Sequence, residues 1–256
     1  MTGKLIKHEW KTYSRAMIPI LLFMAAITAA MWIANLFADE GSTRLAAFWF
    51  IMYSCTAIAV SVIAFLRPAV RFSKNLYGDE GYLMQTLPCS KHALILSKGI
   101  VAGLWNLILV AALLVSMVVS VFHFNVISNL IMPLFNSGMT FGDFWILVSE
   151  DMLQMPVGEA AVFTVLAVVT WMGMLLALLY MCVSIGQLWR SHTLLGTVLA
   201  LLASVIVLVN ISSRLMYNHV FSSAAAMHWS DVIFNAVVAV ICYIVTELLM
   251  SRRLNL

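Results

Sequence analysis

Six long apolar runs divide this chain, and each of them is long enough to cross a lipid bilayer as a helix. A spanning helix needs roughly 20 mostly apolar residues. The runs are continuous rather than alternating, which favours helices over barrel strands, because backbone groups in hydrocarbon must be paired within each segment. The predicted spans are Met17 to Ala38, Ala46 to Leu66, Gly99 to Phe122, Ala160 to Leu188, Thr193 to Ser212 and Val232 to Met250.

The basic residues predict how these spans are oriented, since cytoplasmic loops carry an excess of Lys and Arg. All but two of the 14 Lys and Arg fall on one side of the spans, and the exceptions are Arg44 and Arg214. The third loop, residues 123–159, has acids but no Lys or Arg and is predicted to be extracellular. We therefore expect an all-α integral membrane protein, with residues 1–256 as a single six-helix domain and both termini cytoplasmic.

Composition agrees with a membrane protein and excludes several other classes. The chain is 63% hydrophobic and 10% charged, whereas soluble domains are about 45–50% apolar and about 25% charged. The bases are divided among short loops, which is not the pattern of a nucleic-acid-binding surface. The four cysteines have no C-x-x-C spacing, so no metal site or disulfide framework is expected.

Catalytic motifs are also missing from the sequence. It has no P-loop, no H-E-x-x-H and no G-x-S-x-G pattern, so we expect no ATP site of the P-loop kind and no catalytic residues. No charge lies at mid-depth in a predicted span, which disfavours a proton- or sodium-coupled carrier. Polar residues inside the spans include Asn106 and Glu247, and Glu247 can reach Arg252 or Arg253 at the inner membrane surface.

The first 16 residues predict an amphipathic helix that lies in the inner membrane interface. Ile6, Trp10 and Tyr13 recur at helical spacing on one face, and basic residues recur on another. Such a helix places its apolar face in the headgroup boundary and its bases toward anionic lipid. It either anchors the chain and sets its topology, or acts as an elbow helix that moves with the first span and touches a cytoplasmic partner.

Residues 67–98 form a predicted cytoplasmic loop that is too long for a simple turn. Pro88 is expected to end a short helix, and Ser90 can cap a second helix that continues into the third span. Tyr82 and Leu83 would then offer apolar surface to the cytosol, as a docking site does. On these residues alone, the same side chains could instead fold back onto the bilayer.

The block GDEGYLMQTLPCSKHALILSKGI, residues 78–100, resembles the corresponding loop of ABC-2 type permeases, the transmembrane subunits of bacterial ABC exporters. Six spans, an amphipathic N-terminal helix and cytoplasmic ends are similar too. In that family this loop forms a coupling helix that sits in a groove of a separate P-loop ATPase, which binds the ATP and magnesium. The resemblance implies that the ATPase contacts are Asp79, Glu80, Tyr82, Leu83, Thr86, Leu87 and Pro88.

The resemblance also implies a pathway, an assembly and a location. Spans two and five of similar exporters line the path between two permease copies, which here would place Tyr53, Thr56, Ser204 and Asn210 along the pathway. Two copies, identical or related, would pair with two ATPases in a bacterial plasma membrane. One departure is that the long outer loop here follows span three, whereas better-known members carry theirs between spans five and six.

The expected function is therefore that of a permease subunit of an ATP-driven exporter. Its cargo would be apolar or amphipathic, such as a peptide or an antimicrobial compound, since the spans offer almost no charged contacts. An alternative is a membrane channel, scaffold or sensor subunit that works without an ATPase. An integral membrane enzyme would need a cluster of buried polar residues that the sequence does not reveal.

For the outer loop, residues 123–159, the sequence predicts either an interfacial helix or a lid over an exit.

Overall fold

The computed structural model of the chain describes residues 2–36, 43–77, 91–123, 146, 149–150, 153–189, 192–217 and 224–253. These residues contain no strand and form six long helices, each long and apolar enough to cross a membrane. The helices are α1 (Thr2–Leu36), α2 (Thr43–Tyr77), α4 (Lys91–His123), α7 (Val157–Gly186), α8 (Thr193–Tyr217) and α9 (Ala224–Arg253). The prediction of an all-α, multi-pass membrane protein is confirmed.

Several helices extend beyond the spans predicted from the sequence. A helix of 35 residues, the length of both α1 and α2, measures about 52 Å, whereas the hydrocarbon core of a bilayer is about 30 Å thick. Hydropathy marks the part of a helix that suits hydrocarbon, and the backbone hydrogen bonds can continue past it. The predicted loop over residues 67–98 therefore starts later than expected, because residues 67–77 belong to α2. Residues 91–98 belong to α4, which agrees with the helix predicted to continue into the third span.

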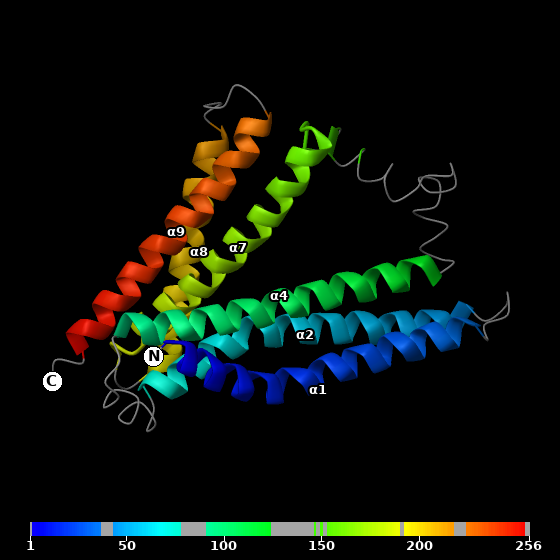
Figure 1. Cartoon of the computed structure of the whole chain (residues 1–256), viewed down its shortest axis with the longest axis horizontal. Helices are drawn as coiled ribbons and strands as arrows, with labels where there is room; N and C mark the ends of the chain where they lie inside the picture. The colour runs from blue at the N-terminus through cyan, green and yellow to red at the C-terminus, as the bar shows by residue number, and fades with distance from the viewer. Residues whose placement is uncertain are drawn as a thin grey trace.

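The predicted N-terminal interfacial helix is not a separate element. Residues 2–36 form one helix, α1, which joins the expected interfacial stretch to the first span without a break. Pro19 lies inside this helix, and Figure 1 shows that α1 bends along its length. Proline removes one helical hydrogen bond and its ring crowds the preceding turn, which is a common cause of such a bend.

The six helices lie in two groups (Figure 1). The first group contains α1, α2 and α4, and the second contains α7, α8 and α9. The groups meet at the end where α1 starts and α9 finishes, and they diverge toward the other end. Contacts between the groups join α2 to α7, α4 to α7 and α4 to α9. We call the meeting point the junction; its core contains Phe72, Leu76, Ile95, Tyr180, Val183 and Met250.

Aromatic and polar contacts fix the junction. The rings of Phe72 and Tyr180 are stacked, with centroids 4.1 Å apart and planes inclined by 10°. One turn further along α2, the Tyr77 hydroxyl donates to Ser184 Oγ at 3.0 Å. Stacked aromatic pairs add about 0.5–1.5 kcal/mol to the free energy gained from burial alone. The ends of α2 and α7 are therefore held together by specific contacts as well as by apolar packing.

Glycine allows α8 to approach α7 closely. The α7–α8 turn brings Gly186 against the first residues of α8. A Cβ atom added to Gly196 would lie 3.1 Å from the Cα of Gly186. A Cβ on Gly186 would lie 2.7 Å from Thr197 N and 2.8 Å from Thr193 O. A side chain has no room there, because both contacts are to backbone atoms. Glycine at position 186 therefore sets how closely α8 packs on α7.

Candidate functional site

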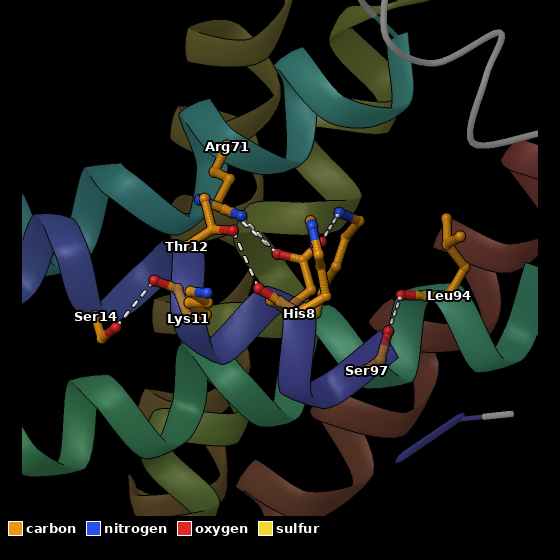
Figure 2. A network of polar contacts seen from close by, with 9 residues as sticks. His8, Lys11, Thr12, Ser14, Arg71, Leu94 and Ser97 are labelled. Atoms are coloured by element: carbon orange, nitrogen blue, oxygen red, sulfur yellow. Dashed lines mark hydrogen bonds and ion pairs between the residues drawn. The ribbon is translucent and has the colours of Figure 1, made fainter. Parts of the chain in front are cut away.

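A buried carboxylate joins the three helices of the first group near the junction. Glu9 of α1 is only 5% exposed. Its Oε2 accepts hydrogen bonds from Arg71 Nη2 at 2.7 Å and from Arg71 Nε at 3.1 Å, and its Oε1 accepts from Lys98 Nζ at 2.5 Å. Arg71 belongs to α2 and Lys98 to α4, and Figure 2 shows Arg71 reaching across to α1. We call these three residues the Glu9 cluster.

The charges of the Glu9 cluster are largely withdrawn from solvent. The Lys98 side chain is 6% exposed and that of Arg71 is 20% exposed. A charge in such surroundings is costly unless it is paired and hydrogen-bonded. The Arg71 guanidinium also lies 5.1 Å from the centre of the Tyr13 ring, where a cation–π attraction adds to the pairing. The cluster therefore differs from a surface ion pair, whose partners are held loosely by water.

Neighbouring hydroxyl groups do not complete the cluster. Thr12 Oγ1 donates to His8 O at 3.0 Å, Ser14 Oγ donates to Lys11 O at 2.9 Å, and Ser97 Oγ donates to Leu94 O at 3.0 Å (Figure 2). Each of these bonds stays within its own helix. In these bonds the hydroxyl groups do not link α1 to α2 or α4.

The apolar face predicted for the N-terminal stretch lies mainly against protein. Tyr13 is 3% exposed and belongs to the core of the first group, and Ile6 packs against that core. Trp10 lies on Trp105 of α4, with ring centroids 5.1 Å apart and planes inclined by 36°. The expectation that these side chains face lipid is therefore wrong for Tyr13. The helical spacing was recognised correctly, but spacing alone does not say whether lipid or protein covers the face.

The Glu9 cluster joins the two helices on either side of residues 78–90. Arg71 lies in the last two turns of α2, and Lys98 lies within the first turns of α4. Both helices that lead into residues 78–90 are thus bound to the same carboxylate. The seven residues predicted to contact an ATPase, Asp79, Glu80, Tyr82, Leu83, Thr86, Leu87 and Pro88, lie outside the described residues.

The predicted pathway residues of α2 are buried within the first group. The Tyr53 hydroxyl and Ser116 Oγ of α4 form a hydrogen bond of 2.9 Å. Thr56 Oγ1 donates to Met52 O of its own helix at 2.8 Å. Within one chain, these two side chains therefore help to pack α2.

The predicted pathway residues of α8 lie in the second group, so the four do not converge on one site within the chain. Ser204 Oγ donates to Ala200 O at 2.8 Å and lies 3.5 Å from Cys182 Sγ of α7. Asn210 is exposed, and its Nδ2 donates to Ile206 O at 2.8 Å. Ser204 thus packs α8 on α7, and the exposed Asn210 satisfies its amide on its own helix.

A second polar contact near the junction joins α4 to α9. The Tyr243 hydroxyl and His92 Nδ1 lie 2.5 Å apart, and Glu247 Oε2 lies 3.7 Å from the same nitrogen. The sequence predicted that Glu247 would be near the inner surface and could pair with Arg252 or Arg253, whose side chains lie outside the described part of the structure. Among the described residues, Glu247 contributes to a contact with another helix.

The sequence did not reveal the role of Glu9, which stands out only as an acid in a basic stretch. A usable signal was the position of Glu9 one helical turn before Tyr13, on the face that carries the apolar residues.

Among the described residues, no group of three or more His, Cys, Asp or Glu could hold a metal ion. No protein-family model matches the chain, and neither a curated protein nor a solved structure matches it.

Proposed function

We propose that this chain is the transmembrane permease subunit of an ATP-driven exporter in a bacterial plasma membrane. The observation that supports the proposal best is the position of the Glu9 cluster. The cluster ties α1 to both helices that flank residues 78–90, and these residues resemble the ATPase-contacting loop of ABC-2 permeases. A force applied to that loop would reach three helices together.

The proposed mechanism is a movement of one helix group against the other. A P-loop ATPase would bind the loop through Tyr82 and its neighbours, and it would hold the ATP and magnesium. Because the Glu9 cluster joins α1, α2 and α4, these helices would move as one body about the junction. Two copies of the permease, with cytoplasmic termini, would move an apolar or amphipathic cargo such as a peptide or an antimicrobial compound between them.

The first test is to replace two adjacent apolar residues of the loop by acids. The variant Tyr82→Asp with Leu83→Asp should lose a P-loop ATPase that the wild-type protein retains, because charge would replace the apolar contact surface. The protein would be purified with a tag from its native host in mild detergent. Mass spectrometry would identify the retained proteins, and ATP hydrolysis would be measured in the same fractions.

A matched control uses the adjacent apolar residues Leu188 and Trp189, which are exposed in the α7–α8 turn outside the proposed contact. The double variant Leu188→Asp with Trp189→Asp should retain the ATPase. A wild-type preparation without any P-loop ATPase would overturn the exporter proposal. That result would favour the alternative of a channel, scaffold or sensor subunit that works without an ATPase.

A further inference from the structure

An open groove of about 860 Å³ lies between α1 and α4. Along α1 it extends from Ile18 to Trp32, which is a rise of about 21 Å at about 1.5 Å per residue. Half of the hydrocarbon core of a bilayer is about 15 Å thick. The groove is lined by alanines of both helices, such as Ala25 and Ala112, whose short side chains leave the space between the helices unfilled. It is therefore long enough for an acyl chain that crosses one leaflet.

Three exposed bases continue the line of the groove toward the start of α1. Lys7, Lys11 and Arg15 are exposed and follow one another at four-residue spacing, which places them on one face of a helix. The same face continues through Pro19, because α1 is helical over its whole length. Further steps of three or four residues lead into the groove. We call this face the α1 strip; it consists of Lys7, Lys11, Arg15, Ile18, Leu22, Ala25, Ala29 and Trp32.

The bases of the α1 strip are not neutralised by acids of the described residues. Glu9 is the one acid in the sequence of α1, and both of its oxygens already accept hydrogen bonds within the Glu9 cluster. None of the ion pairs among the described residues includes Lys7, Lys11 or Arg15. Like charges four residues apart on a helix repel each other. An anion bound between these bases would therefore be stabilising.

The two parts of the α1 strip match the two parts of a phospholipid. Arg15 comes three residues before Ile18, about 4.5 Å along the helix axis, so a headgroup held by the bases would place its acyl chain at the start of the groove. Arginine and lysine bind phosphate through charge-assisted hydrogen bonds, and clusters of bases beside a membrane attract anionic lipids.

A second copy of the chain fits the α1 strip less well. In a two-fold symmetric contact the same surface faces itself, so the bases of one copy would lie near those of the other. Like charges placed together across an interface oppose association. The charge of the strip therefore favours a lipid over a second α1 as the occupant of the groove.

We propose that the α1 strip binds one anionic phospholipid from the leaflet in which α1 begins. Its phosphate lies between Lys11 and Arg15, Lys7 faces the rest of the headgroup, and one acyl chain lies in the groove between α1 and α4. The sequence indicated only a general attraction of the bases to anionic lipid, and the groove adds a defined place for the chain. This site does not depend on the proposed ATPase contact, because it is formed by described residues of one chain.

The test is photolabelling of the full-length protein in phosphatidylcholine vesicles. The probe is a small amount of phosphatidylglycerol with a diazirine in one acyl chain, and mass spectrometry would map the labelled residues. We expect saturable labelling of groove residues on α1 and α4, which unlabelled phosphatidylglycerol displaces. A phosphatidylcholine probe with the same chain should label the groove no more than it labels exposed residues of α8. This comparison needs no variant to fold.

Two pairs of variants test the two halves of the site. Lys11→Gln with Arg15→Gln should weaken the apparent affinity for the phosphatidylglycerol probe about 30-fold, because each base near an anionic headgroup contributes about fivefold. The matched control, Lys74→Gln with Arg214→Gln, removes the same residue types from exposed positions on other helices and should leave the affinity unchanged.

For the groove itself, Ala25→Phe fills the space and should abolish the saturable labelling. Ala26→Phe changes an exposed neighbour that does not line the groove and should have no effect. Equal labelling by both probes, or an unchanged affinity of the variant without Lys11 and Arg15, would overturn the proposal. A groove that neither probe labels would mean that protein covers it, which would overturn the proposal as well.

Discussion

Replacing Glu9 by leucine is expected to lower the free energy of unfolding by about 3–5 kcal/mol, the usual effect of breaking a buried ion pair. The reason is that Arg71 and Lys98, which both contact this carboxylate, would stay buried without a counter-charge. The measurement is unfolding of the purified protein in mixed detergent micelles containing increasing amounts of dodecyl sulfate, followed by circular dichroism.

Two further variants separate the charge effect from a simple loss of packing. The triple variant Glu9→Leu, Arg71→Leu and Lys98→Met should recover most of the lost stability, because removing all partners of a buried ionic group leaves no charge unpaired. Glu159→Leu removes an exposed acid that accepts a bond from Trp229 and should change the stability by no more than about 1 kcal/mol. If Glu9→Leu also changed the free energy of unfolding by less than about 1 kcal/mol, the Glu9 cluster could not hold the three helices together.

Adding one methyl group at Gly186 is expected to destabilise the protein by about 3 kcal/mol, at the upper end of the usual cost of overpacking. The Cβ of Gly186→Ala would lie 2.7 Å from Thr197 N and 2.8 Å from Thr193 O. Since these are backbone atoms, the start of α8 must move away from α7 to relieve the contact. The same unfolding assay measures the loss, and limited proteolysis should show earlier cleavage in the α7–α8 turn.

Gly173→Ala is the matched control, because it makes the same change in the same helix. No atom lies within 4 Å of a Cβ at Gly173, so alanine should fit and should stabilise α7 by up to about 1 kcal/mol through its higher helix propensity. Equal stability of Gly186→Ala and the wild-type protein would mean that α8 does not approach α7 as closely as described.

The spans could be predicted from the sequence because each apolar run carries its own signal. A run such as Ala160 to Leu188 has no alternative to a membrane helix, whatever its neighbours do, and α7 occupies nearly the same residues. The helix ends were predicted less well. Arg71 was assigned to a loop because it is charged, yet it lies in α2 and turns its charge toward Glu9.

The candidate site depends on contacts between distant parts of the chain, and no local pattern of the sequence pairs the residues that make them. Glu9 is 62 residues from Arg71 and 89 residues from Lys98, so helical spacing could not pair them. Asn106 was recognised as a polar residue in a span, but only the packing of the helices reveals that its oxygen is buried without a hydrogen-bond partner among the described residues.

The Glu9 cluster also has a consequence for the biosynthesis of the protein, because its members are made at different times. Residues are added at about 5–20 per second, so the 89 residues from Glu9 to Lys98 take about 4–18 s to make. During this interval the carboxylate lacks the full set of cations that surround it in the finished protein. The start of α1 therefore completes its final contacts only after the nascent chain has extended into α4, which makes its docking a late step of assembly.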